Sequence, residues 1–137
     1  MKTIIVCDAI HPVGFELLKK EQDINVIDAV NTPKDELLKI LGEADVAITR
    51  SSTEVNEAFL EAGKKLKAIV RAGVGVDNVD IDGCSRRGII AMNVPTANTI
   101  AAVELTMAHM LASARSLEYA HNDLKLDRIW KREKWYG

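Results

Sequence analysis

The regular alternation of short apolar runs with segments of helical pattern is the feature that most constrains the fold. The run Lys2–Asp8 is rich in β-branched residues and has almost no polar interruption, as expected of a strand buried on both faces. Strands separated by helices imply right-handed crossovers, and therefore a parallel sheet. The other predicted strands are Asn25–Asp28, Val46–Thr49, Ala68–Arg71 and Ile89–Asn93. We predict an α/β fold with a flavodoxin-like, doubly wound, five-stranded parallel sheet.

The intervals between the strands carry helix signals. We predict a helix over Pro12–Lys20, with Phe15, Leu17 and Leu18 facing inward. Thr32 is expected to cap the next helix, because Pro33 suits the first helical position. Glycines at the expected ends mark where the helices stop. The helix after Thr32 ends near Gly42. A second helix runs from Asn56 to Gly63, and a third runs from Asp80 to Arg87, directly before Gly88.

The segment after Pro95 differs from the rest. Asn98 can cap a long helix running to about Tyr119, whose apolar residues spread around most of its circumference. A helix that is apolar nearly all round needs partners on several sides. We therefore predict a compact lobe over residues 1–95, and a linker helix with the start of a further domain over residues 96–137. We also predict a homo-oligomer formed through the helix from Ile100 to Leu117.

Composition narrows the classes of function. Of the 137 residues, 28% are charged and the net charge is −2, so we expect no nucleic-acid partner, since binding phosphates requires a basic surface. Cys7 and Cys84 are isolated and fit no metal or redox spacing, which favours free thiols in a reducing compartment. With no signal peptide and no membrane-length apolar run, we expect a cytoplasmic protein without a membrane partner.

Ligands of open α/β sheets bind outside the carboxyl ends of the strands, which points to the loops there. Arg50 follows the third strand and is next to Ser51, a combination that suits a carboxylate or phosphate, although a surface ion pair is an equally good interpretation. The turn Ala72–Gly75 could bring its backbone amides to an anion, but an ordinary connection is favoured on these residues alone. It is no dinucleotide fingerprint, because Asn78 stands where the last glycine would be. A plain N-cap is the favoured interpretation of Asn98.

Several motifs in register resemble those of the D-isomer-specific 2-hydroxyacid dehydrogenases, and among them the D-3-phosphoglycerate dehydrogenases. They are ITRSSTEV (48–55), RAGVGVDNVD (71–80), RRGIIAMNVPTANT (86–99), AVELTMAHMLASAR (102–115) and WKREKWYG (130–137). The resemblance covers the whole chain. It implies a substrate lobe completed by a returning C-terminal segment, with a Rossmann cofactor domain inserted between the two.

The resemblance also implies roles for particular residues. Arg50 and Ser51 would bind an acidic substrate, and the backbone of Gly73, Val74 and Gly75 would bind its carboxylate. Val74 would also lie near the nicotinamide of NAD. Asn98 would line the site, and Arg132 would reach toward a substrate phosphate. The family's nucleotide-binding motif and its catalytic arginine, glutamate and histidine fall outside these 137 residues, so no catalytic residue and no metal site are assigned.

The implied reaction is hydride transfer between NAD and a D-2-hydroxyacid, most consistent with D-3-phosphoglycerate and the first step of L-serine biosynthesis. This chain alone is expected to be inactive. The substrate could instead be glycerate, lactate or formate. From another class, an NADH-sensing corepressor shares the fold. A receiver-type signalling domain is disfavoured, because Arg50 occupies the place where that chemistry requires an aspartate.

Overall fold

The computed structural model describes residues 1–130 and 132–135. The chain separates into two compact units, Met1–Ala97 and Asn98–Gly137. Each is described by itself. The assignment of the second unit as a linker helix with the start of a cofactor domain stays a prediction.

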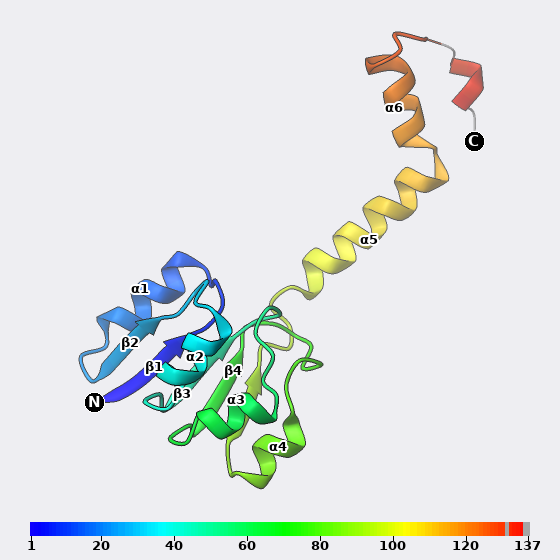
Figure 1. The fold of residues 1–137 in the computed structure, drawn as a ribbon. Helices are drawn as coiled ribbons and strands as arrows, with labels where there is room; N and C mark the ends of the chain where they lie inside the picture. The colour runs from blue at the N-terminus through cyan, green and yellow to red at the C-terminus, as the bar shows by residue number, and fades with distance from the viewer. Residues whose placement is uncertain (131, 136–137) are drawn as a thin grey trace. The chain divides into compact units, whose positions relative to one another are not determined.

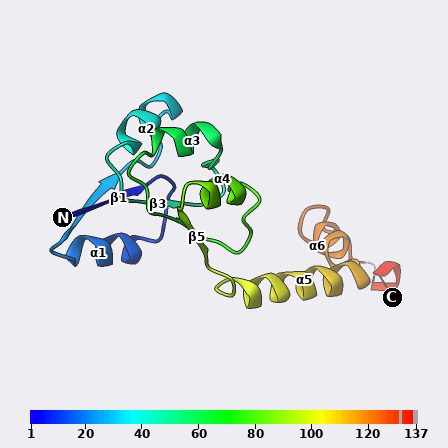
Figure 2. The same ribbon diagram turned by 90° about the horizontal axis from the view of Figure 1, so that it is seen from below.

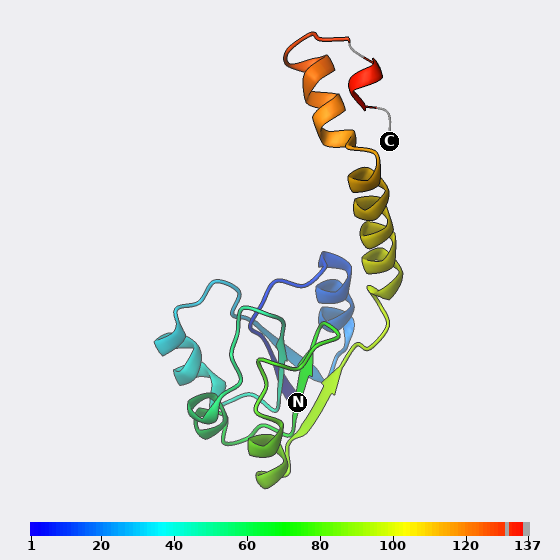
Figure 3. The same cartoon turned by 90° about the vertical axis from the view of Figure 1, so that its right-hand side faces the viewer.

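The first unit is built on a parallel sheet of five strands in the order β2-β1-β3-β4-β5 (Figure 1). The strands are β1 (Lys2–Val6), β2 (Ile24–Asp28), β3 (Val46–Thr49), β4 (Ala68–Arg71) and β5 (Ile90–Asn93). This is the flavodoxin-like strand order, so the predicted fold class is confirmed. Figure 3 shows β4 and β5 running side by side, and their register pairs Arg71 with Asn93.

Helices lie on both faces of the sheet (Figure 2). One face carries α1 (Pro12–Lys20), and the other carries α2 (Lys34–Leu41), α3 (Glu57–Ala62) and α4 (Ile81–Arg86). The predicted end signals of α3 and α4 are confirmed. Asn56 caps α3 by accepting a hydrogen bond from the Phe59 amide at 3.2 Å, and Asp80 caps α4 by accepting one from the Gly83 amide at 2.8 Å. Gly88, after α4, has the positive φ of 67° that glycine tolerates.

The hydrophobic core lies between the sheet and helices α2 to α4. Ile5 and Ile69 from the strands and Leu41 and Phe59 from the helices are almost completely buried there. On the other face α1 buries no residue fully, and all four residues of β5 are exposed. The core packing therefore holds β1, β3 and β4 in place, and the candidate site lies at the carboxyl ends of these strands.

Two sequence predictions are wrong in this unit. Leu17 is 57% exposed, whereas Phe15 and Leu18 are half-buried. Neighbouring helical residues are separated by about 100° of rotation, so Leu17 and Leu18 cannot both face one flat sheet. Thr32 does not cap α2: Pro33 takes the cap position without a side-chain hydrogen bond, and the Thr32 amide instead closes a turn onto the Ala29 carbonyl at 3.1 Å.

The second unit contains α5 (Thr99–Ala114), α6 (Leu117–Lys125) and a 3-10 turn, η1 (Arg132–Trp135). The single helix predicted from Asn98 to Tyr119 is wrong, because Ser116 adopts a left-handed conformation with φ 48° and ends α5. Asn98 stands at the N-cap of α5 but makes no side-chain capping bond. The Trp135 indole N–H donates a hydrogen bond to the Asp123 carboxylate at 3.1 Å, and its ring stacks on Tyr119. None of the described helices is long and apolar enough to span a membrane.

Candidate substrate-binding site

The candidate site lies where the strand order of the sheet reverses. The chain moves outward from β1 to β2 in one direction and from β3 to β5 in the other, so β1 and β3 form the switch point. Open α/β sheets bind ligands in the crevice outside the carboxyl ends of such strands. Asp8 follows β1 and Arg50 follows β3 at this point.

The buried carboxylate of Asp8 organises the loop that carries Arg50. Asp8 is 7% exposed, and its Oδ2 accepts hydrogen bonds from the amides of Arg50 at 2.5 Å and Thr53 at 3.1 Å. Its Oδ1 accepts a hydrogen bond from the Thr53 hydroxyl at 2.9 Å. Three donors aimed at one buried carboxylate compensate its desolvation. These hydrogen bonds therefore tie the chain from Arg50 to Thr53 to the end of β1.

Arg50 has no acidic partner among the described residues, which removes the surface ion pair as an explanation for it. The side chain is exposed, and its Nη1 donates to the Ala9 carbonyl at 3.0 Å. The remaining guanidinium donors are free to bind paired oxygens. Ser51, also exposed, follows it in the loop.

The glycine-containing turn follows the neighbouring strand. Thr49 of β3 pairs with Arg71 of β4, so this turn and the Arg50 loop leave the sheet at the same edge, as predicted. The Gly73 amide donates to the Arg71 carbonyl at 2.8 Å, and its own carbonyl accepts from the Val94 amide at 3.0 Å. Within the described residues no acceptor takes the amides of Val74 and Gly75. These two amides are the available anion donors of the turn.

Sequence reasoning missed Arg71 and Asn78, which join the two loops. The Asn78 amide nitrogen donates to the carbonyls of Arg50 and Thr53, each at 2.6 Å, and its oxygen accepts from Arg71 Nε at 3.1 Å. The Arg71 guanidinium lies where a Cβ on residue 73 would be, so a larger residue than Gly73 would displace this side chain. A signal existed: Arg71, like Arg50, is a lone charge at the end of an apolar strand.

The arginines elsewhere in this unit behave differently. Arg87 pairs with Glu57, and Arg86 lies within 3.9 Å of Glu57 and Asp80. Among the described residues, neither Arg50 nor Arg71 has such a carboxylate partner. The Arg50 and Arg71 guanidinium groups are therefore available to a negatively charged ligand, with the Asp77 carboxylate beside Gly75 in the same turn.

The thiols lie in the interior and do not provide a nucleophile. Burial and the neighbouring Asp8 carboxylate raise the pKa of the Cys7 thiol to about 12. Burial also raises the pKa of Cys84, and Asp80 adds to this effect. Both thiols therefore stay protonated near neutral pH. In the described part of the chain no three side chains of the metal-binding types cluster together.

The remaining predicted site residues belong to the second unit. Asn98 precedes α5, and the backbone of Arg132 begins η1. The Arg132 side chain lies outside the described part of the structure, as do Lys131, Tyr136 and Gly137. The roles implied for Asn98 and Arg132 stay predictions.

Comparison with known proteins identifies relatives along the whole chain. Residues 4–129 match the family model of the D-isomer specific 2-hydroxyacid dehydrogenase catalytic domain. D-3-phosphoglycerate dehydrogenases from Methanocaldococcus jannaschii and Synechocystis are 40% and 39% identical over all 137 residues. The match covers 26% and 24% of those proteins, so the chain spans about a quarter of their length.

Solved structures agree with the sequence comparison. A protein from Thermus thermophilus superposes with a TM-score of 0.82 at 28% identity, over 98% of this chain and 44% of that one. The 3-phosphoglycerate dehydrogenase of Entamoeba histolytica, solved with bound NAD+, gives a TM-score of 0.67 at 30% identity, over 81% of this chain and 38% of that one. The chain therefore belongs to the D-isomer-specific 2-hydroxyacid dehydrogenase family, and the family's catalytic-domain model covers most of its length.

Proposed function

We propose that this chain is the substrate-binding part of an oxidoreductase that transfers a hydride between NAD and a D-2-hydroxyacid, with D-3-phosphoglycerate as the favoured substrate. The observation that carries the proposal is that Arg50 and Arg71 form no ion pair among the described residues, while the amides of Val74 and Gly75, in the turn next to Arg71, have no acceptor there. Family membership supplies the reaction class, and the names of the most similar relatives suggest the substrate.

In the proposed complex each group has its own task. The amides of Val74 and Gly75 donate to the substrate carboxylate, and Arg50 and Arg71 bind the remaining anionic oxygens, with the Ser51 hydroxyl beside them. Gly73 contributes by admitting the Arg71 side chain rather than by donating its amide. Binding the acid at both ends orients its C2 for reaction. Such orientation lowers the activation barrier by up to about 7–11 kcal/mol in favourable cases.

NAD supplies the hydride chemistry when bound, and the residues of this chain position the acid for it. Val74 has an apolar side chain that is 40% exposed on the turn, which fits a contact with one face of a nicotinamide ring. The 137 residues contain no Gly-x-Gly-x-x-Gly sequence to hold a pyrophosphate. We therefore expect a dehydrogenase assay of this chain with NAD and D-3-phosphoglycerate to give no turnover, and measurable turnover would contradict this assignment.

The charge of the site favours a phosphorylated acid over glycerate, lactate or formate. A phosphate at neutral pH carries close to two negative charges. Two arginines that form no ion pair within the described part of the chain match it better than they match a single carboxylate. No observation favours a corepressor role.

The free, buried cysteines fit a reducing compartment, which supports the proposed cytoplasmic location.

We also propose that the second unit mediates self-association. The helix α5 buries no residue, and Ile100, Leu105 and Met110 are each at least 60% exposed. Exposed apolar surfaces of this kind usually mark an interface. Light scattering should give at least a dimer, and Leu105→Glu should shift the mass toward the monomer. A monomer at high concentration in the wild type would contradict the proposal.

Calorimetric titration with D-3-phosphoglycerate tests the proposed site. Removing one charge-assisted contact costs about 1.5–3 kcal/mol, so Arg50→Gln should weaken binding by about tenfold or more. Arg86→Gln, on the exposed side of α4, is the matched control and should leave the Kd unchanged. Equal affinities of Arg50→Gln and the wild type, or a wild type that prefers D-glycerate, would overturn the assignment of the site or of its substrate.

A further inference from the structure

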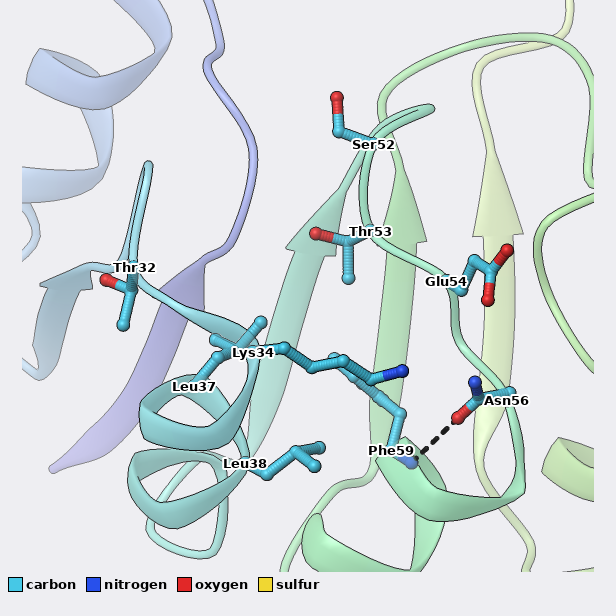
Figure 4. A pocket seen from close by; sticks show the side chains of 9 residues that line it. All are labelled: Thr32, Lys34, Leu37, Leu38, Ser52, Thr53, Glu54, Asn56 and Phe59. Atoms are coloured by element: carbon cyan, nitrogen blue, oxygen red, sulfur yellow. Dashed lines mark hydrogen bonds between the residues drawn. The ribbon is translucent and has the colours of Figure 1, made fainter.

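A cavity lies between α2 and α3, and the chain that follows Arg50 forms part of its wall (Figure 4). Its volume is about 250 Å³, and its walls come from the start of α2, the chain from Ser52 to Glu54, and the start of α3. This volume is many times the roughly 10–15 Å³ that holds one water molecule, so a small organic molecule fits. Neither Arg50 nor the glycine turn lines it.

The lining combines an apolar floor with unused hydrogen-bond donors. Leu37 and Phe59 belong to the buried core and form part of the floor together with Leu38. Lys34 extends across the cavity in Figure 4, and no carboxylate among the described residues pairs with it. Asn56 uses its oxygen to cap α3, which leaves its amide N–H groups as donors. An apolar floor with a few placed polar groups is the usual make-up of a small-molecule site.

Charge decides between the anions that could fit. The lining has one positive side chain, Lys34, and one negative, Glu54, whose carboxylate points away from the Lys34 ammonium in Figure 4. One unpaired ammonium matches a single negative charge, whereas a phosphate dianion would leave a charge uncompensated beside Glu54. The apolar floor in turn favours a hydrocarbon body on the ligand.

We infer that this cavity is a binding site for a small monocarboxylate with a branched or short aliphatic body, distinct from the substrate site at Arg50. The carboxylate lies against the Lys34 ammonium and the Asn56 amide, and the aliphatic body lies on Leu37, Leu38 and Phe59.

Through the loop that carries Arg50, the substrate site is connected to the cavity. Ser52 and Thr53 line it, and Thr53 is hydrogen-bonded to the same Asp8 carboxylate that holds the Arg50 amide. A ligand that restrains Thr53 therefore also restrains Arg50. Coupling of this kind is reciprocal, so each ligand changes the affinity of the other by the same factor. This second part of the inference rests on the proposed function of the Arg50 site.

The test is an NMR titration of the 137-residue chain with 4-methylpentanoate, which has eight non-hydrogen atoms. We expect saturable shifts at Leu37, Leu38 and Phe59, and binding at least tenfold weaker for the neutral 4-methylpentanamide. Lys34→Met should lose the preference for the acid, whereas Lys39→Met, an exposed lysine of the same helix, should keep it. Four results would each overturn the assignment of this site. They are no saturable binding, equal binding of acid and amide, equal loss of the preference in both variants, and tighter binding of inorganic phosphate.

The coupling is tested by repeating the titration with saturating D-3-phosphoglycerate. A changed Kd for 4-methylpentanoate, matched by the same factor in the reverse titration, supports the coupling, and an unchanged Kd overturns it. If D-3-phosphoglycerate produces no shifts at Arg50, Val74 and Gly75, the proposed function fails while the cavity site is judged by the first titration alone.

Discussion

The two units of this chain use apolar residues in opposite ways. Residues 1–97 bury theirs: Ile5, Leu41 and Ile69 are at most 1% exposed. The unit from Asn98 onward contains α5, one of the most apolar segments of the chain, yet no residue of α5 or α6 is buried. Hydrophobicity therefore does not by itself make a core; it does so where strands and helices close around it. We interpret the first unit as self-supporting and the second as a surface for partners.

The largest expected effect lies in the core of the first unit. Leu41→Ala should reduce the free energy of unfolding by about 2–5 kcal/mol, because it removes buried methyl groups and leaves a cavity. Leu105→Ala, at an exposed position of α5, should change it by only about 0.5 kcal/mol. Urea denaturation at low protein concentration measures both. Similar losses in the two variants would remove the distinction between the units.

A smaller effect is expected where the first unit holds its candidate site. Asp8→Asn places an amide N–H against donors from Arg50 and Thr53, so we expect a loss of about 1–3 kcal/mol in unfolding free energy and weaker binding of D-3-phosphoglycerate. Asp82→Asn, exposed on α4, is the control and should leave binding unchanged. Unaltered stability and affinity in Asp8→Asn would show that this carboxylate does not organise the loop.

In the second unit the sharpest test concerns the helix break. Ser116 adopts a left-handed conformation directly after the end of α5, a position where glycine is preferred. Ser116→Gly should stabilise this end locally by about 1 kcal/mol, since it relieves the steric cost of positive φ. Hydrogen exchange at Arg115 and Ser116 should slow, while exchange in β1 and β3 stays the same. Slower exchange throughout the sheet would mean that the units fold as one.

The smallest expected effect is a surface ion pair at the amino end of the sheet. The Lys2 ammonium, 2.8 Å from Asp45, and the Thr3 amide lower the pKa of the Asp45 carboxyl. Because the pKa is lower in the folded state, this contribution to stability is present above the unfolded pKa and is lost as pH falls through the folded one. In an NMR titration, Lys2→Met should raise the Asp45 pKa, while Lys20→Met should not. No change in Lys2→Met would contradict the assignment.

Local signals made much of the first unit predictable. The strands were visible as β-branched apolar runs, and Asn56, Gly63 and Gly88 mark helix ends through effects confined to a few residues. The strand-end rule then selected Arg50 and the glycine turn, because it depends only on strand direction.

The parts that sequence reasoning missed depend on contacts between distant segments. Asp8 reaches Arg50 and Thr53 across 42 and 45 residues, and Asn78 reaches Arg50 across 28. No local pattern encodes such pairs. The helix break at Ser116 was equally hidden, since neither glycine nor proline marks it.

The central claim is that the loops after β3 and β4 bind one acidic metabolite together, and amide chemical shifts test it most directly. The ¹⁵N-labelled chain is titrated with D-3-phosphoglycerate. We predict that the amide resonances of Val74 and Gly75 and the side-chain resonance of Arg50 shift with the same saturable dependence on ligand concentration. The Gly73 amide, already bonded to the Arg71 carbonyl, should move less. Separate curves for the two loops, or no saturable change at either, would contradict the account.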